Sequence, residues 1–131
     1  LRITEAEQKN LLLIFIPYKE SFKIMKVSTP PNRIRGGDRL IVNTTKSRMA
    51  ITLGKAEPLL IEPGKSKLLK GPRGKRAVSI PVLVHRKEKG KKAKFVSTEN
   101  WLCHPLFRKF LFAYTSPRTH RLTFHGVRER L

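Results

Sequence analysis

The strongest candidate nucleophile in this chain is a cysteine. Cys103 is the single cysteine, so the chain has no internal disulfide, and four histidines accompany it. A Cys–His nucleophile requires an imidazole within hydrogen-bonding reach of the thiol. The neighbouring His104 points to the opposite side from Cys103 if this segment is extended. Because Cys103 follows Trp101 and Leu102, we expect it to be a small side chain of the core.

Catalysis by paired carboxylates is also disfavoured. Glycoside hydrolysis, for example, requires two carboxylates at a fixed separation. The nine acidic residues include only one aspartate, Asp38, and the glutamates are scattered along the chain. Glu57 and Glu62 flank a short apolar segment, where a solvent-facing glutamate is the ordinary outcome. The sequence therefore predicts no catalytic residue and a protein that is not an enzyme.

Metal ligands are not grouped in the sequence either. A blue-copper site needs a cysteine, two histidines and a weak axial ligand such as methionine. Met25 and Met49 lie at strand-like core positions, and the segment after Cys103 does not supply the full set of remaining ligands. His120 and His125 differ by five positions, so they face opposite sides of a continuous strand. The sequence predicts no metal site and no cofactor.

Positive charge is the dominant chemical feature of the chain. Its 131 residues include 29 Lys and Arg against nine Asp and Glu, a formal net charge of +20. Such a charge attracts polymers and surfaces that carry phosphate, sulfate or carboxylate groups. Residues 64–94 hold twelve of the basic side chains and one acid, Glu88, and we expect these twelve to bind a polyanion. They are Lys65, Lys67, Lys70, Arg73, Lys75, Arg76, Arg86, Lys87, Lys89, Lys91, Lys92 and Lys94.

Two alternatives to this polyanion site stay open. Any one of the lysines is also explained as a solvated loop residue that protects a sheet edge from aggregation. Nucleic acid is the second candidate partner, through phosphate contacts alone. Proteins that bind single strands interleave aromatic and basic residues, but most aromatics here lie in 107–114 and at Phe124, in expected core strands. Only Tyr18, Phe95 and Trp101 are expected beside charge.

Short β-strands are the elements that must position these residues. Segments rich in β-formers alternate with turn residues throughout the chain. Strands are expected over residues 22–28, 39–44, 49–53, 59–61, 66–69, 78–84, 94–101, 110–114 and 121–127. Glu62-Pro63-Gly64-Lys65 is typical of a type II turn and predicts a hairpin between 59–61 and 66–69. A second hairpin is expected between 78–84 and 95–101, with the charged loop 87–92 at its tip.

These strands predict an all-β fold, because their connections are too short for crossover helices. We expect residues 1–131 to form one domain, a single antiparallel β-sandwich of about eight or nine strands, immunoglobulin-like or barrel-like. Residues 1–10 are expected to be a loose or briefly helical extension with a capping box at 4–7. The longest apolar run, 11–17, is too short to cross a bilayer. In this fold the clusters 65–76 and 86–94 lie at opposite ends of one strand, as two patches.

Three segments resemble small, uncharacterised bacterial proteins of the cell envelope. They are residues 42–45 (Val-Asn-Thr-Thr), 62–66 (Glu-Pro-Gly-Lys-Ser) and 112–119 (Phe-Ala-Tyr-Thr-Ser-Pro-Arg-Thr). The resemblance implies an exported, periplasmic or secreted protein and no known catalytic residue. Together with the charge, it makes an anionic glycan, lipid headgroups or an acidic protein the leading partners. Nucleic acid is the alternative, and a structural subunit covered by acidic neighbours is a third hypothesis.

Overall fold

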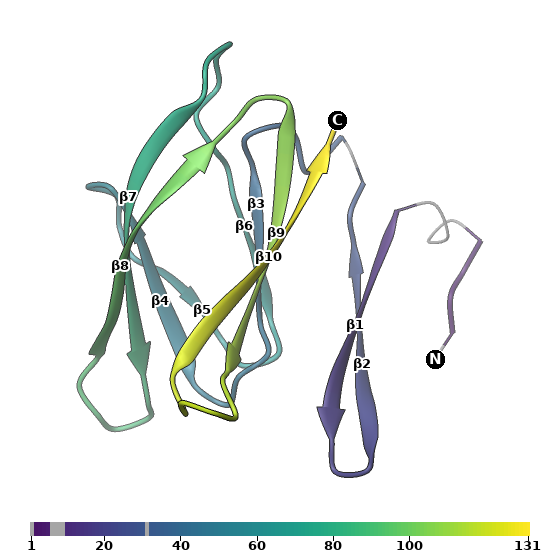
Figure 1. Ribbon diagram of the computed structural model, residues 1–131, viewed down its shortest axis with the longest axis vertical. Coiled ribbons are helices and arrows are strands. Elements are labelled where there is room, and N and C mark those ends of the chain that lie inside the picture. The colour runs from purple at the N-terminus through teal and green to yellow at the C-terminus, as the bar shows by residue number, and fades with distance from the viewer. Residues whose placement is uncertain (1, 6–9, 31) are drawn as a thin grey trace. The chain divides into compact units, whose positions relative to one another are not determined.

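The computed structural model describes residues 2–5, 10–30 and 32–131 (Figure 1). Ten strands form three sheets, and no helix occurs within these ranges. The predicted all-β fold is therefore confirmed, whereas the capping box expected at 4–7 lies partly outside the described residues. The chain divides into two compact units, residues 1–34 and residues 35–131. That the whole chain forms one domain stays a prediction.

The first unit contains one β-hairpin. Strands β1 (Leu11–Tyr18) and β2 (Ser21–Ser28) pair antiparallel along their full length. The tight turn between them places Lys19 in the left-handed region, with φ of 53°. The strand predicted over 22–28 is confirmed as β2. β1 has no counterpart among the predicted strands, because its uninterrupted apolar run lacks the period-two alternation that marks a half-buried strand.

The second unit contains two four-stranded sheets. One has the order β10-β9-β3-β6, with β3 (Arg39–Asn43), β6 (Ser66–Leu69), β9 (Phe107–Thr115) and β10 (Leu122–Arg130). The other has the order β5-β4-β7-β8, with β4 (Arg48–Leu53), β5 (Leu59–Ile61), β7 (Val78–Lys87) and β8 (Lys94–Cys103). All neighbours pair antiparallel except β3 and β9, which are parallel. This departs from the expected antiparallel pairing, because β9 enters its sheet at the end where β3 also begins.

One apolar cluster ties the two four-stranded sheets together. Alternation along the strands produces it: Val82 and Val84 of β7 are fully buried, whereas Leu83 between them is exposed. The cluster comprises Ile41, Met49, Ile51, Ile61, Leu69, Val82, Val84, Trp101, Leu111 and Ala113. Burying one such aliphatic side chain contributes about 1.5–3 kcal/mol, so this cluster is the main stabilising feature of the unit. Both Met49 and Cys103 are buried, as expected for core residues.

The predicted hairpin between 59–61 and 66–69 is wrong. β5 pairs with β4, and β6 pairs with β3, so residues 62–65 carry the chain from one sheet to the other. The turn itself forms: the Lys65 amide donates to the Glu62 carbonyl at 3.1 Å, and Gly64 has φ of 72°. Asn43 of β3 holds it through backbone bonds to Gly64 and Lys65. The conformation of a turn depends on its own residues, whereas the sheet that β5 or β6 joins depends on strands far away in the chain.

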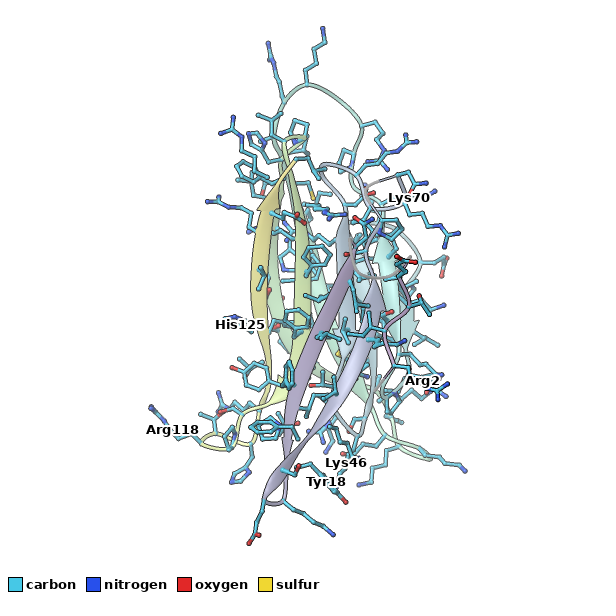
Figure 2. All side chains as sticks on the ribbon, turned by 90° about the vertical axis from the view of Figure 1, so that its right-hand side faces the viewer. Arg2, Tyr18, Lys46, Lys70, Arg118 and His125 are labelled. Carbon is cyan, nitrogen blue, oxygen red and sulfur yellow. The ribbon has the colours of Figure 1, made fainter. Side chains whose placement is uncertain are left out.

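The loops of residues 35–131 gather at two ends of this unit. The strand registers place residues 44–47, 62–65, 88–93 and 116–121 at one end, which we call the basic end. Residues 35–38, 54–58, 70–77 and 104–106 lie at the opposite end. Figure 2 shows Lys46 and Arg118 at the basic end and Lys70 at the opposite end.

Candidate anion-binding surfaces

The structure divides the predicted polyanion site in a different place from the sequence. Pairing of β7 with β8 is confirmed, and it places residues 86–94 at the basic end and residues 70–76 at the opposite end. Lys65, however, lies in the sheet-crossing turn at the basic end, and Lys67 lies on the edge strand β6. The predicted cluster 65–76 is therefore not one patch. Eleven of the twelve side chains are exposed, and Arg86 is partly buried.

The basic end collects cations from four loops and from the strand ends beside them, and these strands belong to both sheets. Its cations are Lys46, Arg48, Lys65, Arg86, Lys87, Lys89, Lys91, Lys92, Lys94, Arg118 and Arg121. Glu62 and Glu88 are the only acids in these segments. The sequence prediction did not include Lys46, Arg48, Arg118 and Arg121, because they are distant in the chain and stand singly. These four cations could have been predicted only by working out which loops lie at the same end of the two sheets.

Both acids of the basic end are already neutralised. Arg48 contacts Glu62 at 2.7 Å, and Glu88 contacts Lys91 at 2.9 Å and Arg86 at 3.3 Å. The hydrogen bond from Lys91, and then its charge, lower the pKa of Glu88 below its ordinary value. A hollow of about 460 Å³ lies between these loops, with Lys46, Arg48, Lys87 and Lys89 among its lining residues. The walls of this hollow carry net positive charge and are open to solvent.

A buried asparagine holds the first of these loops in place. The Asn43 side chain is fully buried, and its Nδ2 donates to the carbonyls of Ser47 at 2.8 Å and Ile61 at 3.0 Å. Its Oδ1 accepts from the Thr45 amide at 3.0 Å and the Thr45 hydroxyl at 2.7 Å. Arg86 also contacts this loop, because its Nε donates a hydrogen bond to the Ser47 hydroxyl at 3.0 Å. The Asn-Thr-Thr segment thus has a structural role that positions the neighbouring cations.

At the opposite end, one of the predicted cations forms an ion pair within the protein. The buried Asp38 carboxylate accepts the amides of Arg35 and Gly71, at 2.9 and 3.0 Å, and forms an ion pair with Arg73 at 2.9 Å. The loops approach so closely that a Cβ on Gly71 would lie 2.1 Å from the Gly37 carbonyl oxygen. Arg73 therefore locks two loops together. Lys70, Lys75 and Arg76 stay exposed at this end.

A second concave surface lies between the edge strands β8 and β10, and we call it the edge groove. Its volume is about 720 Å³. Apolar and aromatic side chains line its floor, among them Trp101, Leu111, Leu122 and Phe124, and Phe95 is 61% exposed at its rim. Its cations are Arg39, Arg86, Lys94, Lys109 and Arg121, and its one acid is Glu99. Trp101 and Phe95 do lie beside charge, but the groove itself has no counterpart in the sequence prediction.

Three cations stand side by side next to this groove, and two of them, Arg39 and Lys109, line it. Arg39, Lys109 and Arg128 occupy paired positions on the adjacent strands β3, β9 and β10, and we call them the cation row. Burial, and then the charges of the two arginines, lower the pKa of Lys109 below its ordinary 10.5. The Arg39 guanidinium lies 5.0 Å from the Trp101 ring, and that of Arg128 lies 4.6 Å from the Phe107 ring. Like charges on neighbouring strands repel, so these aromatic contacts partly offset an unfavourable arrangement.

Groups with catalytic or metal-binding potential are dispersed. No set of three His, Cys, Asp or Glu residues suited to a metal ion occurs in the part of the chain that the structure describes. Cys103 is a buried free thiol, and His104 accepts the Leu106 amide on Nδ1 at 3.1 Å. Over the same residues, the structure has no helix with the length and apolar character needed to cross a membrane.

The sequence matches no protein-family model, and comparisons with curated proteins and with solved structures give no significant match.

Proposed function

We propose that residues 35–131 form an immunoglobulin-like β-sandwich that binds an anionic polymer or surface at its basic end, without catalysing a reaction. The observation that carries this proposal is the convergence of eleven cations from four loops and the strand ends beside them, at an end where both acids are already in ion pairs. Most of these cations therefore keep their charge available for a partner. The two-sheet apolar cluster supports the sandwich part of the proposal, because it buries the inward faces of both sheets together.

The proposed mechanism is neutralisation of phosphate, sulfate or carboxylate groups with release of their counterions. Cations on adjacent loops act together within a Debye length of about 8 Å at physiological ionic strength. Lysines 87, 89, 91 and 92 provide mobile point charges, whereas Arg48 and Arg86 provide planar forks for oxyanions. Anionic glycans, lipid headgroups and acidic proteins are the proposed partners, and an exported location follows from the envelope resemblance.

The first hairpin favours nucleic acid as the second candidate. Phe15 and Phe22 are 57% and 60% exposed, and their rings meet edge to face at 6.3 Å. The Lys23 ammonium lies 4.3 Å from the ring of Tyr18, which is also exposed. Exposed aromatics beside lysines are the arrangement on which unpaired bases stack. RNA binding that depends on these rings would make nucleic acid the primary partner.

Two triple variants distinguish the basic end from the opposite end. Lys89, Lys91 and Lys92 are changed together to Glu at the basic end, and Lys70, Lys75 and Arg76 are changed together to Glu at the opposite end as a charge-matched control. Binding to heparin, RNA, duplex DNA and anionic liposomes is measured for each across a salt series. We expect the basic-end variant to lose about tenfold or more in affinity for one class at 0.15 M salt, because several phosphate or sulfate contacts are lost.

Three outcomes would contradict the proposal. Equal loss from both variants would show that net charge, and not the basic end, controls binding. A larger loss from the control would move the site to the opposite end. A Phe22→Ala variant that loses RNA affinity while heparin binding is unchanged would favour the nucleic-acid candidate. Circular dichroism of each variant confirms that the strands remain folded.

A further inference from the structure

The edge strands of the two sheets in residues 35–131 are short and connected on one side, and long and unconnected on the other. On one side the edge strands β5 and β6 have only three and four residues, and residues 62–65 join them covalently. On the other side β8 and β10 have ten and nine residues, and each has one strand neighbour within the described ranges. Natural sheets usually shorten, charge or cover their edges, because unpaired backbone groups attract another strand. The presence of two long edge strands, β8 and β10, therefore calls for a functional explanation.

The edge groove lies between these two long edges and presents apolar surface. Trp101 of β8 and Phe124 of β10 meet edge to face at 6.2 Å and form its floor. Gly126 of β10 lets the adjacent Leu111 side chain pack closely against its backbone, since a Cβ at this position would lie 3.0 Å from Leu111 Cδ2. An extended chain presents alternate side chains to one face. Such a chain, laid along β8 or β10, would direct every second side chain to this floor.

The cation row adds a requirement for negative charge. No ion pair joins Arg39, Lys109 or Arg128 to a carboxylate within the described residues. Arg39 is only 4% exposed; its guanidinium donates to the Leu102 carbonyl, but its Nε has no hydrogen-bond partner. The one acid of the groove, Glu99, accepts a hydrogen bond from Trp101 Nε1 at 2.7 Å. A buried cation without a counter-charge is costly, and an incoming carboxylate would relieve that cost.

We propose that the edge groove binds an extended segment of an acidic partner protein whose groove-facing residues, at alternate positions, are apolar in the middle and acidic at an end. The segment adds as a strand to β8 or β10, and its apolar side chains pack on Trp101 and Phe124. A carboxylate on the same face lies against the cation row, because Lys109 and Arg128 share a sheet face with Leu111 and Phe124. Main-chain hydrogen bonds to the free edge supply part of the affinity, and side chains on alternate positions supply the specificity. This site differs from the basic end proposed above, and Arg86, Lys94 and Arg121 lie where the two surfaces meet.

Charge argues for an acidic partner and against a segment of this chain. The groove and the cation row together carry six cations against Glu99 alone. The hairpin of β1 and β2, residues 11–28, carries three lysines and one glutamate, so it would add positive charge to the groove. A second copy of residues 35–131 is also unfavourable, because this unit has 23 basic and six acidic residues. An acidic partner is complementary to the groove in sign.

The test uses synthetic peptides of the length of β10, with blocked ends, and the full chain. In the first, called the alternating peptide, every second residue faces the groove; these residues are valine in the middle and glutamate at both ends, and threonine stands between them. The second peptide has the same sequence with proline at two adjacent central positions. The third is polyglutamate. We expect the alternating peptide to bind at least tenfold more tightly than either control, because proline removes edge donors and polyglutamate lacks apolar side chains. Equal binding of the proline peptide would overturn strand addition. Equal binding of polyglutamate would overturn recognition of apolar residues. Competition by a fatty acid, with no effect of proline, would assign the groove to a small amphiphile.

Two single variants separate this proposal from the proposed function. Lys109→Gln removes the central charge of the cation row, and Lys55→Gln removes an exposed lysine from the loop of residues 54–58, outside both proposed sites, as a control. We expect Lys109→Gln to lower affinity for the alternating peptide about tenfold and to leave heparin binding unchanged, since a partly buried charge acts at short range. The Lys55→Gln variant keeps both activities. Loss of peptide binding in Lys55→Gln, or no change in Lys109→Gln, would overturn the assignment whether or not the basic end binds heparin.

Discussion

The two sides of residues 35–131 differ in how the edges of the two sheets are arranged. On the β5–β6 side the chain itself crosses between the sheets, and Asn43 hydrogen-bonds the crossing from within. On the β8–β10 side the sheets remain separate, and Trp101 meets Phe124 at the floor of an open groove. Among the described residues, the first side is hydrogen-bonded within the protein, whereas on the second side each edge strand has one strand neighbour and the cation row has no carboxylate partner. One core is thus closed by the chain on one side and stays open as a groove on the other.

Asn43→Ala is expected to have the largest effect on stability. Removing the amide breaks its four hydrogen bonds, two to the Ser47 and Ile61 carbonyls and two from the Thr45 amide and hydroxyl. The Thr45 hydroxyl keeps its hydrogen bond to the Ser47 carbonyl. With about 1 kcal/mol for each of four hydrogen bonds, the free energy of unfolding falls by about 4 kcal/mol. Urea denaturation measures the change. On the open side, Thr123→Ala serves as control and is expected to change stability by less than about 0.5 kcal/mol. A small loss for Asn43→Ala would show that the closed side is not held by this residue.

Ile61→Ala tests packing on the closed side. Ile61 is fully buried on the edge strand β5, so its truncation leaves a cavity and should cost about 3 kcal/mol. Phe124→Leu on the open side should cost only about 1 kcal/mol, because Phe124 is partly exposed and the groove already admits solvent. Thermal and urea unfolding of both variants gives the comparison. Equal costs would mean that the open side is packed as tightly as the closed side.

Lys109→Gln is expected to stabilise the open side near neutral pH. Burial and neighbouring arginines lower the pKa of Lys109 in the folded state, so the unfolded chain binds this proton more tightly. The unfavourable contribution is complete below the lowered pKa and fades as the pH rises towards 10.5, where both states lose the proton. The stability advantage of the variant should therefore shrink between pH 7 and pH 10.5. An advantage that is constant with pH would mean that charge at Lys109 is not its cause.

Phe95→Ser is expected to have the smallest effect on stability. The ring is 61% exposed at the rim of the edge groove, so its removal should change the free energy of unfolding by less than about 0.5 kcal/mol. Affinity for the alternating peptide should nevertheless fall severalfold, because the rim loses apolar area. Unfolding curves and peptide titrations are compared on the same preparation. A destabilised variant with unchanged peptide affinity would reverse the roles assigned to the two sides.

Local features of the fold were predictable from the sequence. The strands β2 to β10 lie where alternating apolar residues and turn residues predicted them, and the turn at 62–65 forms with Gly64 at positive φ. The hairpin drawn across that turn was wrong, since β5 and β6 pair with other strands. β1 was missed because a run of apolar residues does not distinguish a strand from a buried helix segment.

The candidate sites were predictable only in part. The charged loop 88–93 follows from its composition and from the β7–β8 hairpin, which the structure confirms. Lys46, Arg48 and Arg118 join it through the arrangement of two other loops, 44–47 and 116–121, and no local pattern marks them. Arg73 belongs to a predicted cluster but pairs with Asp38, 35 positions earlier in the chain. Contacts of this range depend on the packing of whole strands.

The strand-forming segments, the positions of the turns and the net charge of +20 follow from the amino-acid sequence alone. These properties depend on backbone preferences over a few residues or on a simple count of charges. Which strands are neighbours, and therefore that Arg39, Lys109 and Arg128 share one row, is known only from the folded structure. Strand order and register follow from burying both sheet faces in one core, a condition that residues far apart in the chain must satisfy together.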